Sequence, residues 1–138
     1  MSRTRSQIIG QERGAVLISG LLLALALLIL IGAAVDIGHA FIIRRQLVSL
    51  ADDAALTGSQ ALDLAALHNG RLALDPAQAQ SAALQTLAGE PGLQTRAQAS
   101  SGAVEVEVKR QFPTVLLRLV GISTLTVAAQ ATAAPRAP

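Results

Sequence analysis

The chain has 138 residues, and 51% of them are hydrophobic, but its only aromatic side chains are Phe41 and Phe112. Two phenylalanines are too few for the stacking surface that binds single-stranded nucleic acid. The net charge of +2 comes from the N-terminus, because the sequence from Asp36 onward holds eight acidic and eight basic residues. A neutral domain lacks the basic face that nucleic acids require. The absence of cysteine excludes disulfide bonds and thiolate metal sites.

Residues 14–35, GAVLISGLLLALALLILIGAAV, form a run without a single charge. As a helix this run would be roughly 33 Å long, which matches the hydrocarbon core of a bilayer. It is longer than the apolar part of a typical cleaved signal peptide, so we expect an uncleaved signal-anchor. Arg3, Arg5 and Arg13 precede the run and favour a cytoplasmic segment at residues 1–13, with the rest of the chain exported.

The helical pattern continues beyond the apolar run. From Phe41 to about Leu67 there is no proline, and apolar or small residues recur at steps of three and four, which is typical of one helix face. These residues are Leu47, Leu50, Ala51, Ala54, Gly58, Ala61, Leu62 and Ala65. We therefore predict that residues 36–70 extend the anchor helix to about Leu67, giving one helix of roughly 80 Å that stops at His68-Asn69-Gly70.

Residues 71–132 are predicted to form a small domain, followed by a flexible tail at 133–138. Asp75-Pro76 is a helix start, and the second helix is expected over about Pro76–Ala88, with Gly89 in the left-handed conformation that ends a helix. Alternating residues predict strands, at Leu93–Ala99, Ala103–Lys109 and Thr124–Thr132, with a short helical turn from Pro113 to Val120 closed by Gly121. The predicted fold class is α+β: a long N-terminal transmembrane helix that extends into a domain with a second helix and a three-stranded antiparallel sheet.

The order of motifs in residues 13–62 resembles the N-terminal module of TadE/TadG-like Flp (Tad) pilus-assembly proteins. The resemblance rests on four pieces, in this order: the lead-in Arg13-Gly14-Ala15; the end of the apolar run, Ala34-Val35-Asp36-Ile37-Gly38; Phe41 followed by Arg44 or Arg45; and the small-residue run Ala51-Asp52-Asp53-Ala54-Ala55-Leu56-Thr57-Gly58. The chain is short beside the longer TadG-like members, which carry a large extra domain. This favours a minor, pseudopilin-like subunit over an adhesin.

The resemblance implies a pilin-like architecture and a non-enzymatic structural role in assembly of a Flp/Tad-type pilus or related secretion apparatus. It implies a single-pass protein of the bacterial inner membrane, with its C-terminal domain periplasmic or extracellular. The expected partners are membrane lipid and other pilus-assembly or pilin subunits, in a homo- or hetero-oligomer. A membrane-tethered ligand-binding module unrelated to pili is the alternative.

Prepilin peptidase substrates of this kind carry a glutamate five residues after the cut. A cut after Gly10 would place Ala15 there, and a cut after Gly14 would place Ser19. We therefore do not predict this cleavage.

The candidate functional residues form a helix-packing interface, listed here in chain order: Asp36, Gly38, Leu47, Ala51, Ala54, Gly58 and Ala61. Small side chains let a second helix approach closely, so the stripe could receive another subunit or, alternatively, the chain's own domain. A carboxylate at the end of an apolar run is costly in lipid. Asp36 is therefore expected either to face water at the membrane surface or to pair with a basic group of a neighbouring subunit.

Nothing in the sequence predicts catalytic, cofactor-binding or metal-binding residues. His39 and His68 lie far apart and lack companion ligands for a metal site. Asp52 and Asp53 are adjacent, so on a helix they point to different sides. We therefore expect a protein that is not an enzyme and that binds no cofactor.

Overall fold

The computed structural model describes the backbone of residues 4–136 and the side chains from Gly14 to Arg136. The side chains of the predicted cytoplasmic segment, residues 1–13, and the last two residues of the predicted tail therefore lie outside the described part. The chain divides into two compact units. The first contains Met1–Ile37 and Thr114–Ser123, and the second contains Gly38–Pro113 and Thr124–Pro138.

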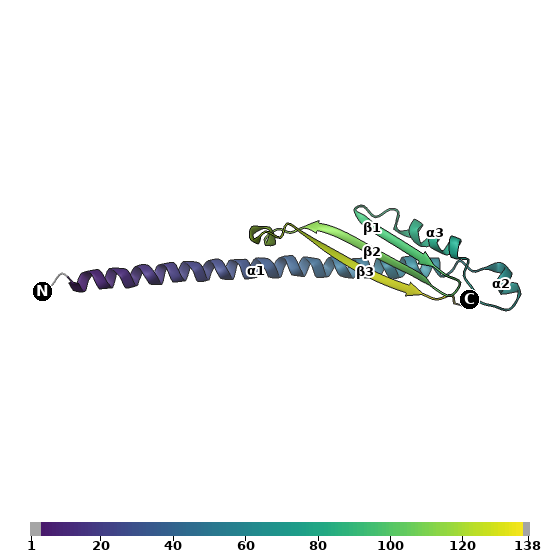
Figure 1. The fold of residues 1–138 in the computed structure, drawn as a ribbon, viewed down its shortest axis with the longest axis horizontal. Coiled ribbons are helices and arrows are strands. Elements are labelled where there is room, and N and C mark those ends of the chain that lie inside the picture. Colours follow the sequence, from purple (N-terminus) through teal and green to yellow (C-terminus); the bar gives the residue numbers. More distant parts are fainter. Residues whose placement is uncertain (1–3, 137–138) are drawn as a thin grey trace. The chain divides into compact units, whose positions relative to one another are not determined.

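The N-terminal helix α1 runs from Thr4 to Gly58 and supplies residues to both units (Figure 1). Its segment Gly14–Gly58 is long and apolar enough to cross a membrane. Large aliphatic side chains in the first unit, from Val16 to Ile31, are exposed on every side of the helix. Such a surface suits lipid on all sides, since a helix on the surface of a soluble domain is apolar on one side only. A candidate transmembrane helix near the N-terminus is thus a feature of the structure.

Helix α1 ends at Gly58, so the prediction of one helix to about Leu67 is wrong beyond this point. Residues 61–63 instead pair with residues 73–75: the amide of Asp63 donates to the carbonyl of Ala73, and the amide of Asp75 donates to the carbonyl of Ala61. Gly58 itself lies close to α3 (Pro76–Leu87), since a Cβ atom there would lie only 2.8 Å from the carbonyl oxygen of Ala79. The chain then turns, and the Asp63 side chain accepts hydrogen bonds from the amides of Ala65 and Ala66. These bonds begin a separate short helix, α2, at Leu64–His68.

Helix α3 begins where the sequence predicts. The Asp75 carboxylate accepts hydrogen bonds from the amides of Ala77 and Gln78, and Pro76 occupies the first turn. The expected left-handed glycine at Gly89 is wrong, because Gly92 has the positive φ of 69° and Gly89 does not. The left-handed residue therefore comes directly before the first strand, one tight turn after the helix end.

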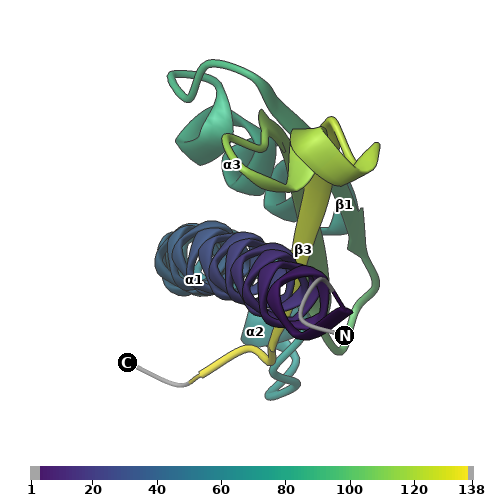
Figure 2. The same cartoon turned by 90° about the vertical axis from the view of Figure 1, so that its left-hand side faces the viewer.

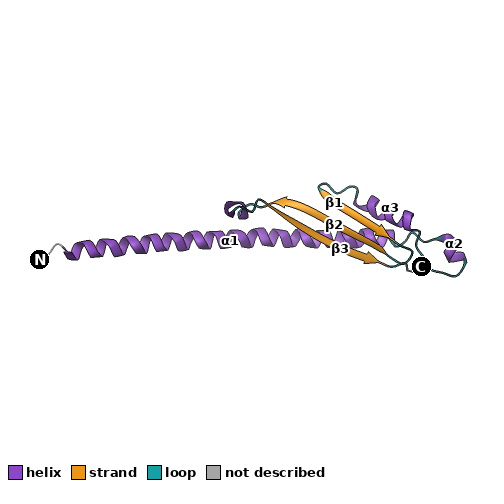
Figure 3. Cartoon of the chain, viewed as in Figure 1, coloured by secondary structure: helices purple, strands orange, loops and turns teal. Residues whose placement is uncertain are grey.

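The sheet has the order β1-β2-β3, and both pairs are antiparallel (Figure 3). Its strands are β1 (Leu93–Ala99), β2 (Val104–Pro113) and β3 (Thr124–Ala133). Ala97 pairs with Val106, and Val108 pairs with Ala129. The α+β class and the three-stranded antiparallel sheet are confirmed, with β2 reaching Pro113 instead of ending at Lys109.

The core of the second unit lies between the sheet and two helices. In Figure 2, α3 and the later turns of α1 lie on the same side of the strands. Leu47 of α1, Ala83 of α3 and Val106 of β2 are completely buried in one hydrophobic cluster. Alternate residues of β2 supply the sheet side of this core, as the Val-Glu pattern predicts.

Candidate functional site

The first unit contains a buried carboxylate in a helix that is otherwise apolar. Asp36 is only 3% exposed, whereas the neighbouring Val35 and Ile37 are well exposed. The expectation that this carboxylate faces water is therefore wrong. It lies against the loop Thr114–Ser123, which joins β2 to β3 and contains the short 3-10 helix η1 (Leu117–Val120).

Three successive backbone amides of this 114–123 loop donate hydrogen bonds to Asp36. The amide of Val115 lies 3.1 Å from Oδ1, and those of Leu116 and Leu117 lie 2.9 Å and 2.7 Å from Oδ2. Hydrogen bonds to an ionised acceptor are roughly twice as strong as neutral ones. The carboxylate thus caps the amides that open η1 and fixes the loop against α1.

Gly32 allows the close approach between α1 and the loop. It precedes Asp36 by one helical turn, so both residues lie on the same face of the helix. A Cβ atom on Gly32 would lie 2.7 Å from the Cβ of Leu116, closer than two carbon atoms can pack. Any larger residue would therefore push the loop away from the carboxylate that holds it.

The 114–123 loop also holds itself together. The amide of Thr114 donates to the carbonyl of Ser123 at 3.0 Å, and the Thr114 hydroxyl donates to the carbonyl of Ile122. Gly121 closes η1 with a positive φ of 91°, as the sequence predicts for the end of this turn. These bonds join the two ends of the loop.

Asp36 connects two distant segments of the chain. Both of its oxygens accept backbone hydrogen bonds from the 114–123 loop. The contact joins two segments 79 to 81 residues apart in the sequence. The residue is therefore a positioning group for the 114–123 loop.

The predicted small-residue stripe is covered by the chain's own domain. Leu47, Ala51 and Ala54 are completely buried in the core of the second unit, and Ala61 is partly buried beside it. Gly58 touches Ala79, Ala83 and Val104. This is the alternative that the sequence left open, in which the domain itself packs on the stripe.

Gly38 lies apart from the other predicted interface residues. It is exposed, and nothing would lie within 4 Å of a Cβ atom placed on it. Gly38 therefore makes no close packing contact within the described chain.

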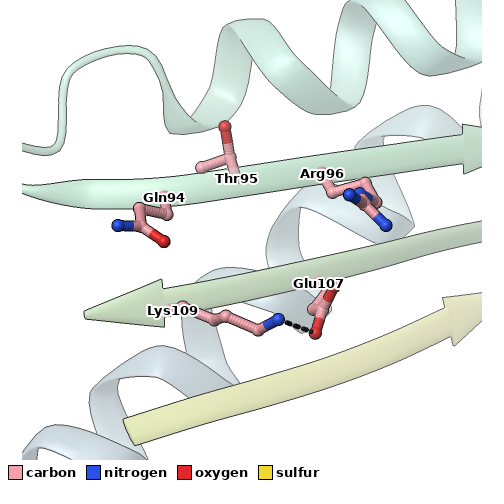
Figure 4. A pocket seen from close by; sticks show the side chains of 5 residues that line it. All are labelled: Gln94, Thr95, Arg96, Glu107 and Lys109. Atoms are coloured by element: carbon pink, nitrogen blue, oxygen red, sulfur yellow. Dashed lines mark ion pairs between the residues drawn. The ribbon is translucent and has the colours of Figure 1, made fainter. Parts of the chain in front are cut away.

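The solvent side of the sheet carries a shallow depression of about 200 Å³. Figure 4 shows its lining, which is Gln94, Thr95, Arg96, Glu107 and Lys109. The Lys109 ammonium lies 2.7 Å from Glu107 Oε1 and donates the hydrogen bond that lowers the pKa of this partly exposed carboxyl. An open, charged surface of this kind is typical of a solvated sheet face.

The histidines have structural contacts. The ring of His39 packs edge-on against Phe112, with centroids 5.3 Å apart. Nδ1 of His68 lies 2.7 Å from the Leu64 carbonyl, to which it donates. Among the side chains of residues 14–136, no group of three or more His, Cys, Asp and Glu could hold a metal ion.

Sequence reasoning missed Gly32 and the 114–123 loop as parts of one site. The signals were the spacing of Gly32 and Asp36, which share a helix face, and the apolar composition of residues 115–122, VLLRLVGI. Neither signal alone says that the two segments meet.

Comparisons with protein-family models, with curated proteins and with solved structures found no match to this chain.

Proposed function

We propose that this chain is a non-enzymatic structural component in assembly of a Flp/Tad-type pilus or a related secretion apparatus, acting as a minor pseudopilin-like subunit. The observation that carries the proposal is α1: one helix combines a charge-free lipid-suited run with an extension that packs in the core of a small α+β domain. The motif order of residues 13–62, which resembles TadE/TadG-like proteins, supports it.

The proposed topology follows from the charges around the apolar run. Arg3, Arg5 and Arg13 precede it, and arginines near a span favour the cytoplasmic side. The N-terminus then lies in the cytoplasm of a bacterium, and the second unit lies in the periplasm or outside the cell.

The proposed contact with other subunits uses the anchor part of α1. The small-residue stripe of the extension is occupied by the chain's own sheet and α3. Residues 16–31, in contrast, expose aliphatic side chains in every direction. Membrane helices associate through van der Waals packing, and we place the contact with the helices of other pilus subunits on this part of α1.

Deletion of the gene, followed by electron microscopy of surface filaments and co-purification of small membrane subunits, tests this function. We expect filaments to be lost and then restored by the intact chain. A second complementing variant replaces residues 14–31 with leucine at every position and keeps Gly32 and Asp36. It should remain in the membrane but fail to restore filaments, because its packing surface is different.

A membrane-tethered ligand-binding module would give the opposite result. Its function depends on the outer domain alone, so the all-leucine anchor would support it fully. Normal filaments after deletion, or full rescue by the all-leucine variant, would contradict the proposal.

A further inference from the structure

The 114–123 loop exposes more apolar surface than a loop in water normally does. Val115 is 67% exposed and Leu119 is 72% exposed, and Val120 and Ile122 are exposed as well. Its one charged residue is Arg118. Soluble proteins rarely leave contiguous apolar patches uncovered, and such patches mark contacts with membranes or partners.

The position of this loop along α1 indicates what covers it. The loop touches α1 between Gly32 and Asp36, within the same compact unit. On both sides of this contact the helix itself exposes aliphatic residues, including Ile31, Val35 and Ile37. The loop therefore lies at a level of the helix that suits lipid.

The hydrogen bonds of the loop point to the same environment. Irregular backbone is tolerated at membrane depth only where its polar groups are satisfied by protein, because lipid offers no partners. Asp36 accepts the amides of Val115, Leu116 and Leu117, and those amides in turn satisfy a carboxylate that would be costly in lipid. The hydrogen bonds donated by Thr114, Leu119, Gly121 and Ile122 close within the loop.

We propose that the 114–123 loop is a second membrane-contacting element, which inserts its apolar side chains into the lipid beside the domain end of the anchor. These side chains are Val115, Leu119, Val120 and Ile122. Arg118 reaches from the loop to the lipid phosphates, since a long basic side chain can extend to the interface while its neighbours stay in the acyl region. The proposal rests on the membrane anchoring proposed above.

Lipid is a better occupant than a second copy of the chain. The loop contacts α1 at Gly32 and Asp36, next in sequence to the exposed Ile31 and Val35 of the anchor, which lipid already surrounds if the anchor spans the bilayer. The single cation on the loop complements anionic headgroups. The described apolar surface of the anchor and the loop carries no acidic side chain. A second copy of the chain would therefore offer Arg118 no carboxylate for an ion pair at this level.

Depth-dependent fluorescence quenching tests the insertion directly. The chain has no tryptophan and no tyrosine, so a single introduced tryptophan reports one position. Leu119→Trp, Leu25→Trp and Gln98→Trp place it in the loop, in the anchor and on the solvent side of the sheet. Each full-length variant is reconstituted in phosphatidylglycerol–phosphatidylethanolamine vesicles that contain acyl-brominated lipid, at low protein density.

We expect L25W and L119W to lose emission with brominated lipid, and L119W to be quenched most by bromines near the headgroup. Q98W should respond only to an aqueous quencher. If brominated lipid quenches L25W while L119W behaves like Q98W, the inference about the loop is wrong, but the proposed membrane anchoring is supported. If L25W escapes lipid quenching, the proposed anchoring itself is wrong.

Two further outcomes address the occupant and the helix contact. If L119W is shielded from both quenchers, protein covers the loop, and the lipid proposal is overturned in favour of a second copy.

Gly32→Leu in the L119W background should weaken lipid quenching, because the added side chain meets Leu116. Gly20→Leu is the matched control, since its Cβ would meet nothing within 4 Å. Equal lipid quenching in the two variants would contradict the inference that α1 positions the loop.

Discussion

The two parts of α1 are built for different surroundings although they form one continuous helix. Residues 14–31 carry large aliphatic side chains in every direction, and these side chains are exposed. From Ile43 to Gly58 the buried residues occupy one face and become small toward the end of the helix. The first part is suited to lipid, and the second is suited to a sheet and a second helix at close range. The change from all-round exposure to one-sided burial therefore shows where the surroundings of the helix change.

The largest effect is expected from placing charge in the lipid-suited part. Each arginine at the centre of a membrane helix costs about 2.5–3.5 kcal/mol on insertion scales, and each leucine contributes about 0.3–0.6 kcal/mol in favour. The double change Leu25→Arg with Leu28→Arg should therefore cancel most of the insertion free energy. We expect the protein to leave the alkaline-resistant membrane fraction. Leu25→Ala with Leu28→Ala is the matched control and should stay; equal extraction of both would remove the basis for an anchor.

A large loss of stability is expected from Leu47→Ala in the domain-facing part. Leu47 is completely buried, and such a truncation costs about 2–5 kcal/mol of the free energy of unfolding. Leu56→Ala is the control on the same helix, because Leu56 is 46% exposed. Denaturant unfolding of both full-length variants, followed by circular dichroism in detergent micelles, checks the difference. Similar losses would show that one-sided burial does not hold in this part of α1.

A smaller and local effect is expected at the boundary, from Asp36→Asn. The asparagine side chain offers one accepting oxygen where the carboxylate offers two, so amides of the 114–123 loop lose a partner. An orphaned buried donor costs about 1–3 kcal/mol. Hydrogen exchange should accelerate at Val115, Leu116 and Leu117 and stay unchanged in the sheet. Asp53→Asn, at an exposed position of α1, should leave exchange unaltered; acceleration by both changes would argue against a specific contact.

The signals that predicted the fold are local ones. The charge-free run at 14–35, the Asp75-Pro76 pair and the alternation of valine with glutamate or lysine in residues 104–109 each encode their own element. The structure contains a candidate membrane helix, α3 and β2 at those places. No long-range information is needed for any of them.

The features that the sequence could not predict depend on contacts between distant segments. Helix α1 ends at Gly58 although the small-residue pattern continues through Ala61 and Ala65, and the Ala61 carbonyl instead accepts a hydrogen bond from the amide of Asp75. The partner of Asp36 lies about eighty residues away, and no periodicity connects the two segments. Backbone amides are also invisible in a sequence, so a search for a basic partner of Asp36 could not have found them.

The smallest effect is expected on the solvent side of the sheet, at an ion pair outside the buried core. The Lys109 side chain lowers the pKa of Glu107 by donating a hydrogen bond, below the ordinary 4.5 of this side chain. A lowered pKa contributes stability above the unfolded value that is lost as the pH falls through the folded value. Stability of the native chain should therefore decline slightly more below pH 4.5 than that of Glu107→Gln, as measured by thermal unfolding. An identical loss of stability at low pH in both proteins would show that the ion pair does not contribute to stability.

Single-cysteine accessibility along α1 tests the change of surroundings most directly, because the chain has no cysteine of its own. Variants from Val16 to Thr57 are treated with a membrane-impermeant maleimide in spheroplasts. We predict no labelling at any position from Val16 to Ile31. Later in the helix, labelling is expected at Ser49, Asp53 and Thr57, with protection at the buried Leu47, Ala51 and Ala54. Periodic labelling within residues 16–31, or no labelling at Ser49 and Asp53, would contradict the account.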